Sequence, residues 1–405
     1  MSSNRRVRQL IYVLIFLMGM ALPPLAVGVK AVTEKPLPPV IHKSELTNLL
    51  AHSARNISKG QPFVVRDAGY GSLTIVPAIN RHLQKQAEAL LLAQKSRRAA
   101  VVVVEAETGR VLALAGLNSG HLAPEAALAA DAPAASLFKM ITAAAALEET
   151  NLEPGSKLKF AGRPHTLYRY QLKTNPHRRQ RKITLMKSFA DSNNPVFARL
   201  GIHHLGGEVL TGYARAMGYG RHLSFELPVG ISRLAEPASD FQVGELACGF
   251  NRKTTISPLH AALIVSVFVN GGRFYEPWVV ESVKGREGKT LYRGHSQATD
   301  PLVSQETCLG MRRLFEATVS QGTARRAFRR LGRDRVLKGL QVGGKTGTLR
   351  GPDRRELFEW FAGYALDPRT GRALAVASLV VHGKVRFANP KALARKILQA
   401  AFTSV

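Results

Sequence analysis

A glycine-rich segment near the C-terminal end constrains the fold more than any other feature of the sequence. Residues 339–351 read GLQVGGKTGTLRG, with Lys345 at the centre. One interpretation is a P-loop, G-x-x-x-x-G-K-T, which follows a buried parallel strand and opens a helix that holds phosphates. The other interpretation is a K-T-G triplet, which serves a serine-acylating enzyme. The two interpretations require different folds, so the flanking residues decide between them.

The flanking residues argue against the P-loop. Gly347, Gly351 and Pro352 follow the lysine closely, and the next organised segment, 357–366, has the aromatic residues typical of a strand. The preceding segment, 333–339, is charged and short for a buried parallel strand. No alternation of strands and helices follows. We therefore favour the K-T-G interpretation.

The K-T-G interpretation predicts companion motifs, and the sequence contains them. Ser136 and Lys139 form an S-x-x-K at the start of a helix predicted over 137–149, where both side chains share one face. The positive end of that helix helps a nearby lysine to lose its proton. Ser192 and Asn194 form an S-x-N in a loop between two predicted helices. Because each motif is short, the order and context of all three carry the inference.

Each motif also has a structural explanation that needs no chemistry. A serine such as Ser136 or Ser192 commonly caps a helix or forms a turn. Lys139 and Lys345 could be exposed lysines of a helix and a strand edge. A second S-x-x-K, at Ser156, follows a Pro-Gly break and opens no apolar helix, so we interpret it as a chance match.

The order of the predicted elements indicates an α+β fold. Strands are expected at 99–106, 110–116, 357–366 and 373–382, and a final helix at 390–402. Helices dominate between these two groups of strands. We therefore expect one mainly antiparallel sheet built from both ends of the domain and flanked by helices, with a helical subdomain inserted. Further helices are expected at 79–94, 184–190, 195–206 and 258–272.

The N-terminal segment predicts export. Arg5, Arg6 and Arg8 precede an apolar run over 10–22, and no charged residue occurs between Arg8 and Lys30. A basic flank followed by about 20 uncharged residues can span a bilayer with its basic end in the cytoplasm. The competing interpretation is a cleaved signal peptide with small residues at 26–28.

The predicted domain organisation follows from this anchor. Residues 1–29 are expected to be a cytoplasmic tip and transmembrane helix, 30–71 a proline-containing linker and short N-terminal region, and 72–405 the catalytic domain. We expect a single-pass protein of the inner (cytoplasmic) membrane, with its catalytic domain on the periplasmic or extracellular side.

The charge of the chain predicts an anionic partner. The formal net charge is +29 at pH 7, with basic clusters at 177–182 and 325–335, each of which is either a solvated surface or a binding surface. Membrane head groups and envelope polymers are acidic, whereas no nucleic-acid-binding signature is present. Cys248 and Cys308 fit no metal-binding spacing, and we expect two buried thiols, with one disulfide between them as the alternative, and no metal site or cofactor.

Taken together, these motifs resemble those of the penicillin-binding proteins, the serine D,D-transpeptidases of bacterial cell-wall synthesis. The segments VVVVEAETGRVLALAG, SQGTARRAF and EWFAGYAL also resemble family segments. So does the segment at 247–272, although Ser257 and His260 replace the usual Thr and Gln. The resemblance covers roughly residues 72–400. It implies the fold shared by these transpeptidases and the serine β-lactamases.

The resemblance also implies roles for the motif residues. Ser136 would attack the D-Ala-D-Ala carbonyl, with Lys139 as its base. Ser192 would relay a proton to the leaving amine, and Asn194 would bind the substrate amide. Lys345 would supply a second positive charge that keeps Lys139 neutral.

The remaining predicted site residues belong to the strand of the K-T-G triplet. Lys345, Thr346 and Thr348 would bind the terminal carboxylate of the substrate, and Gly347 would leave the strand edge open to the peptide. Backbone N–H groups of Ser136 and Thr348 would form the oxyanion hole.

The implied partners are peptidoglycan stem peptides, β-lactams, the membrane and a separate glycosyltransferase, because no glycosyltransferase domain is recognisable. A D,D-carboxypeptidase or β-lactamase would use the same acylation site with water as the second nucleophile. A non-catalytic penicillin-binding sensor or scaffold is a further alternative.

Overall fold

The computed structural model describes residues 40–94, 96–173, 179–351, 355–383, 386 and 388–403. Val40–Val405 form one compact unit. The predicted membrane anchor at 1–29 lies outside the described residues, as does most of the proline-containing linker. No helix in the described part of the chain is long and apolar enough to cross a membrane.

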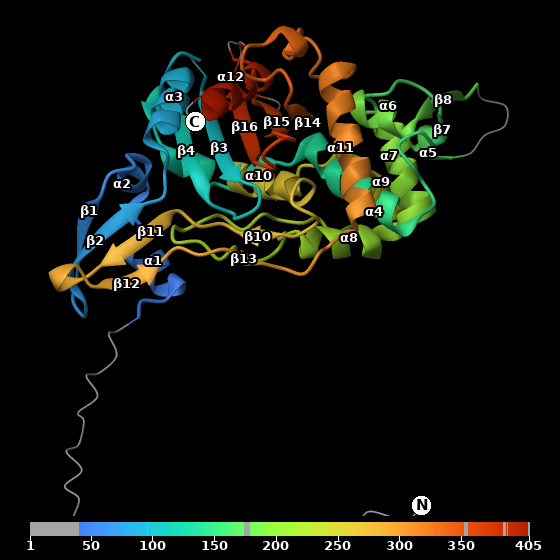
Figure 1. Cartoon of the computed structure of the whole chain (residues 1–405). Helices are drawn as coiled ribbons and strands as arrows, with labels where there is room; N and C mark the ends of the chain where they lie inside the picture. Colours follow the sequence, from blue (N-terminus) through green and yellow to red (C-terminus); the bar gives the residue numbers. More distant parts are fainter. Residues whose placement is uncertain are drawn as a thin grey trace, which may run out of the picture. The chain divides into compact units, whose positions relative to one another are not determined.

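A six-stranded antiparallel sheet forms the centre of this unit, with the strand order β14-β15-β16-β3-β4-β5 (Figure 1). Its strands are β3 (Arg98–Glu105), β4 (Val111–Asn118), β5 (His121–Leu122), β14 (Gln341–Arg350), β15 (Leu357–Leu366) and β16 (Ala373–His382). Because β16 pairs with β3, strands from the two ends of the domain meet in mid-sheet, with Ala377 opposite Val102. The α+β architecture and the antiparallel sheet built from both ends are confirmed.

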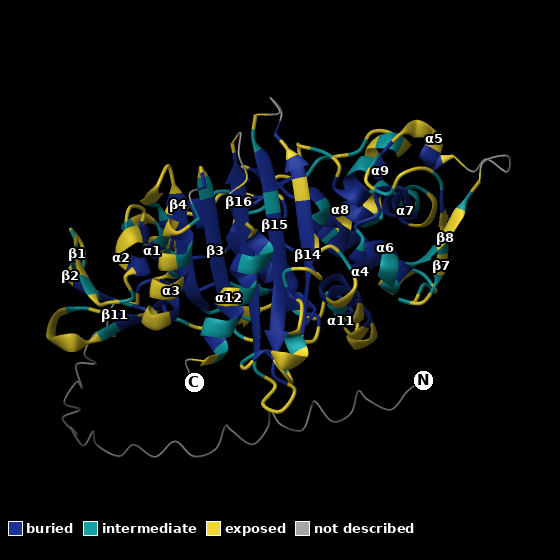
Figure 2. Ribbon diagram, turned by 90° about the horizontal axis from the view of Figure 1, so that it is seen from above, coloured by how far each residue is buried: buried dark blue, intermediate teal, exposed yellow. Residues whose placement is uncertain are grey.

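The middle strands are apolar on both faces because helices cover both. Val101 and Val103 of β3 belong to one core, and Val102 and Val104 belong to another on the opposite face. Figure 2 shows the long strands buried along almost their whole length. Helices α3 and α12 cover the first face and α10 the second. These helices are α3 (Arg81–Leu92), α10 (Pro258–Val267) and α12 (Pro390–Thr403).

A helical region is inserted between β5 and β14, and it lies beside β14 (Figure 2). It comprises α4 (Lys139–Glu149), α5 (Arg169–Leu172), α6 (Leu185–Ala190), α7 (Asn194–Leu200), α8 (Gly206–Ala216), α9 (Asp240–Cys248) and α11 (Gln305–Ser320). The helix predicted over 195–206 is interrupted, because α7 gives way to a π-helical turn at Gly201–Leu205. The helix predicted over 258–272 ends early, before Gly271 and Gly272, which both have positive φ.

A second, four-stranded sheet lies on the opposite side, near β4 (Figure 2). Its order is β1-β2-β11-β12, so it joins an early segment of the chain to a late one. Its strands are β1 (Phe63–Asp67), β2 (Gly71–Pro77), β11 (Val280–Lys284) and β12 (Thr290–Arg293), preceded by α1 (Lys43–Leu49) and α2 (Ala54–Ser58). Short pairs complete the fold: β6 (Ala132–Pro133) with β9 (Thr255–Ile256), β7 (Lys157–Phe160) with β8 (Arg181–Thr184), and β10 (Tyr275–Glu276) with β13 (Gln297–Ala298).

Candidate active site

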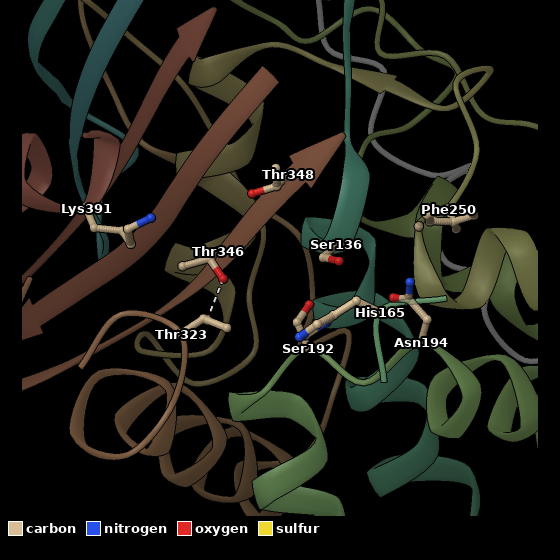
Figure 3. Close-up of a pocket in the computed structure, with 10 residues that line it drawn as sticks. Ser136, His165, Ser192, Asn194, Phe250, Thr323, Thr346, Thr348 and Lys391 are labelled. Atoms are coloured by element: carbon tan, nitrogen blue, oxygen red, sulfur yellow. Dashed lines mark hydrogen bonds between the residues drawn. The ribbon is translucent and has the colours of Figure 1, made fainter. Parts of the chain in front are cut away.

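Three segments that are far apart in the sequence meet around one pocket of about 410 Å³ (Figure 3). Ser136 comes from the turn before α4, Ser192 and Asn194 from the start of α7, and Thr346 and Thr348 from β14. The pocket is also lined by His165, Gly249, Phe250, Thr323 and Lys391. The structure therefore brings all three predicted motifs together.

Ser136 and Lys139 lie side by side where the chain enters α4. A single 3-10 turn, Ala135–Phe138, leads directly into this helix, and Lys139 Nζ lies 2.9 Å from Ser136 Oγ. Ala135 has a φ of +49°, which L-residues rarely adopt. Gly249 packs so closely on it that a Cβ at Gly249 would lie 1.8 Å from the Ala135 carbonyl oxygen. The surrounding chain thus holds the serine in one position.

The amine of Lys139 is fully buried and contacts three oxygen atoms. Besides Ser136 Oγ, these are Asn194 Oδ1 at 2.8 Å and the Cys248 carbonyl oxygen at 2.6 Å. The last two oxygens can only accept, whereas a hydroxyl can also donate. A neutral amine satisfies all three by donating its two N–H groups to Asn194 and Cys248 and accepting the Ser136 proton. This geometry is that of a base facing its nucleophile.

Lys345 reaches Ser192 from β14. Its buried Nζ donates to Ser192 Oγ at 3.1 Å and to the Thr346 carbonyl at 2.9 Å. An ammonium group has three donors, so one remains for a further acceptor. Ser192 has a φ of +57°, an uncommon conformation that often marks functional sites. Because Ser192 also lines the pocket, its hydroxyl connects the buried lysine to the place where a substrate would lie.

Burial of two lysines close together favours a state in which one of them is a neutral amine and the other an ammonium. Burial lowers the pKa of Lys139 to about 8, because a buried ammonium loses its hydration. Burial, and then the nearby charge of Lys139, lower the pKa of Lys345, while Asp191 opposes this decrease. The contacts of Lys139 suit a neutral amine, and the carboxylate of Asp191 favours the charged form of Lys345. We therefore assign the neutral form to Lys139 and the charged form to Lys345.

Strand β14 forms one wall of the pocket. It is the terminal strand of the described sheet, so one of its edges is left unpaired by the other described strands. Thr348 is exposed on this wall. Thr346 Oγ1 lies 2.6 Å from Thr323 Oγ1, which fixes the orientation of both hydroxyl groups (Figure 3). An open strand edge with fixed hydroxyls can receive an extended peptide.

Gly347 allows β14 to approach the nucleophile segment closely. It lies opposite Trp360 of β15, and a Cβ at Gly347 would come within 3.2 Å of Trp360 and 3.4 Å of Ala135 Cβ. Trp360 Nε1 donates to the Pro133 carbonyl oxygen at 2.9 Å. The strand and the segment that presents Ser136 are therefore packed against the same buried indole ring.

Several residues of this site were not identified from the sequence. Thr323 lies in the segment SQGTARRAF, which resembled a family segment without suggesting a role for it. Cys248 was expected only as a buried thiol, yet its carbonyl oxygen contacts the base, and no side-chain pattern predicts such a contact. His165 and Lys391 stand in no motif, and Phe250 lies in the family-like segment at 247–272 without a role suggested for it, so only the fold reveals that they line the pocket.

Other sequence interpretations are settled by the same structure. The second S-x-x-K falls at β7, since Lys157–Phe160 form that strand, and neither Ser156 nor Lys159 lines the pocket. Cys248 and Cys308 are free, buried thiols, as expected. The next described element after β14 is β15 and not a helix, which excludes the P-loop.

Comparison with known families agrees with this geometry. The model of the penicillin binding protein transpeptidase domain matches residues 99–399. The chain belongs to the penicillin-binding protein transpeptidase family. Membership confirms the resemblance inferred from the three motifs and their order.

Two relatives of this chain match it over different shares of their length. Stage V sporulation protein D of Bacillus subtilis (strain 168) is 30% identical over 218 residues, which make up 53% of this chain and 32% of that protein. The peptidoglycan D,D-transpeptidase PbpA of Mycolicibacterium smegmatis is 27% identical over 345 residues, or 76% of this chain and 67% of that protein. This chain thus spans about a third of the first relative and about two thirds of the second.

Solved structures show the same fold. PBPA from Mycobacterium tuberculosis superposes with a TM-score of 0.65 at 24% identity, covering 82% of this chain and 81% of that one. Penicillin binding protein 3 from Mycobacterium tuberculosis in its apo form gives a TM-score of 0.67 at 18% identity, covering 88% and 84%.

Proposed function

We propose that the chain is a peptidoglycan D,D-transpeptidase that crosslinks stem peptides through an acyl-enzyme on Ser136 and is inhibited by β-lactams. The observation that carries this proposal is the buried amine of Lys139, 2.9 Å from Ser136 Oγ, with acceptors at its other contacts. PbpA of Mycolicibacterium smegmatis bears the name of this activity. The similar PBPA of Mycobacterium tuberculosis is described in acyl-enzyme complexes with penicillin G and imipenem.

In the acylation step, Lys139 takes the hydroxyl proton of Ser136 while Oγ attacks the carbonyl carbon between the two D-alanines. Backbone N–H groups of Ser136 and Thr348 stabilise the developing oxyanion. The C–N bond then breaks, and the departing D-alanine amine receives a proton through the hydroxyl of Ser192. The oxygen of Asn194 is occupied by Lys139, which leaves its NH₂ group to hold the substrate amide.

In the second step, the amine of another stem peptide attacks the ester carbonyl. A new amide bond forms as the ester bond breaks, and the proton that the attacking amine gives up passes through Lys139 to Ser136 Oγ. In the preceding acylation step, the positive charge of Lys345 and the hydroxyls of Thr346 and Thr348 bind the terminal carboxylate of the donor peptide, which then leaves with the released D-alanine. Thr323 supports this carboxylate site through its contact with Thr346.

We also propose that residues 1–29 anchor the chain in the inner membrane, that 30–71 lead to the catalytic domain, and that 72–405 act outside the membrane. The basic flank and the uncharged run of the N-terminus support this arrangement. A separate glycosyltransferase is the proposed partner. A structural neighbour, with a TM-score of 0.62 at 20% identity, comes from a peptidoglycan synthase complex that coordinates polymerization and crosslinking.

Labelling with a fluorescent penicillin tests the acylation site. We expect a persistent labelled band that is lost in Ser136→Ala. The product formed from a pentapeptide substrate then separates the alternatives. A crosslinked dimer supports the transpeptidase, whereas a tetrapeptide indicates a carboxypeptidase and rapid loss of label indicates a β-lactamase. Absence of label from the folded chain would contradict acylation and favour a scaffold.

A further inference from the structure

A second pocket, of about 520 Å³, lies between α12 and the segment that precedes β14. It contains none of the residues that line the candidate active site. Five of its eight lining residues are arginines, namely Arg329, Arg330, Arg333, Arg335 and Arg395. Four of the five arginines come from the basic cluster predicted at 325–335, for which the acylation mechanism has no use.

The segment that carries these arginines is held in place from α12. Arg395 donates to the carbonyl oxygens of Ala327 at 3.0 Å and Arg329 at 3.1 Å. Its second terminal nitrogen donates to Asp334 Oδ2 at 2.6 Å, and Gln399 donates to the same oxygen at 2.7 Å. One helix therefore fixes the segment at three points.

Apolar side chains fix the same segment to the sheet. Phe328 is 2% exposed, and its ring centroid lies 5.2 Å from that of Phe361 in β15. Leu337 is 1% exposed and belongs to the same core. The arginines thus project from a fixed backbone, so a ligand would meet a largely preformed site.

The charges of this pocket are not balanced within the protein. The carboxylate of Asp334 is already bound by Arg395. Arg329, Arg330, Arg333 and Arg335 are exposed, and none has a carboxylate within ion-pair distance among the described residues. Like charges gathered around one pocket repel each other, and no ion pair within residues 40–94, 96–173, 179–351, 355–383, 386 and 388–403 balances these four.

We propose that this arginine pocket is a binding site for phosphate groups of an anionic ligand, separate from the active site. A guanidinium group presents a planar fork of donors that matches phosphate oxygens. Several guanidinium groups around one pocket offer more N–H donors than the two oxygens of a carboxylate can accept. A phosphate group has more acceptor oxygens, so it matches this pocket better than a carboxylate does. The net charge of +29 would further attract a polyanion.

The test is binding of a fluorescently labelled polyphosphate to the purified full chain, followed by anisotropy. The pocket variant is Arg333→Gln with Arg335→Gln. The control variant is Arg325→Gln with Arg326→Gln, which removes the same charge from the same exposed segment outside the pocket lining. One charge-assisted contact corresponds to about tenfold in affinity, so the pocket pair should weaken binding about tenfold or more and the control pair much less.

Two further measurements identify the cause. An Arg333→Lys and Arg335→Lys variant keeps the charge but loses the fork, so it should bind more weakly than wild type and more tightly than the Gln pair. Penicillin labelling of Ser136 should be unchanged in all these variants, which separates this proposal from the proposed acylation. Inorganic phosphate should compete with the labelled probe.

A comparison of phosphatidylglycerol with phosphatidylcholine vesicles identifies the source of the phosphate. If the pocket variant binds more weakly than the control variant to phosphatidylglycerol vesicles alone, lipid head groups supply the phosphate, and this result supports the proposed phosphate site. Binding of soluble polyphosphate with the same discrimination indicates a phosphate-bearing polymer. Equal weakening by both Gln pairs, or no binding of either probe, would overturn the proposal.

Discussion

Raising the pH from 6 to 9 should accelerate the acylation of Ser136 by a β-lactam, because only the neutral form of Lys139 can accept the serine proton. Burial lowers the pKa of this lysine from an ordinary value of 10.5 to about 8. Burial alone therefore produces a base within the physiological range, whereas an exposed lysine would stay protonated there.

The size of the effect follows from this pKa. The neutral fraction of Lys139 is about one hundredth at pH 6, about one eleventh at pH 7 and one half at pH 8. The second-order rate constant for acylation should then rise roughly ninefold, fivefold and twofold over the three successive pH units. The folded-state pKa is depressed, so the unfolded chain binds more protons between pH 8 and 10.5. Stability against unfolding should therefore rise with pH in that window.

Stopped-flow measurement with a fluorescent penicillin supplies the rate constants. Lys139→Met keeps the length of the side chain but removes the base, so its rate should be lower by about two to four orders of magnitude and nearly independent of pH. Loss of charge from Lys345, whose pKa is also lowered by burial and by the charge of Lys139, would oppose this rise in rate. A rate constant for the wild-type chain that stays flat between pH 6 and 8, or falls, would refute the assignment of Lys139 as the base.

Three substitutions test the contacts around the site. Thr323→Val loses the hydroxyl bonded to Thr346, so acylation should slow several-fold and stability should fall by about 1 kcal/mol, measured by penicillin labelling and urea unfolding. Cys248→Ala removes the thiol but keeps the carbonyl that contacts the base, so labelling should stay within about twofold of wild type. Gly249→Ala should abolish labelling and lower the melting temperature, because its Cβ would collide with Ala135 and its φ is +68°. Normal labelling of Gly249→Ala, or loss of labelling in Cys248→Ala, would contradict these assignments.

Local sequence was sufficient for most of the sheet. The strands predicted at 357–366 and 373–382 coincide with β15 and β16. Continuous apolar runs bounded by charged and turn residues indicate buried strands without any knowledge of tertiary contacts. Helix α11 was not predicted. Its sequence carries Gly310 in the middle, and it becomes helical in the context of its packing against α4, α6 and β14.

The sequence by itself determined the motifs, their order and the elements that carry them. At the predicted helix start, the spacing of three residues places the side chains of Ser136 and Lys139 on one face. Tertiary structure alone decided the chemistry around that pair. The burial that lowers the pKa of Lys139, the carbonyl of Cys248 that accepts a hydrogen bond from it, and the hydroxyl of Thr323 all depend on contacts between distant segments. A pKa depends on the hydration and charges around a group, and only the folded chain creates those surroundings.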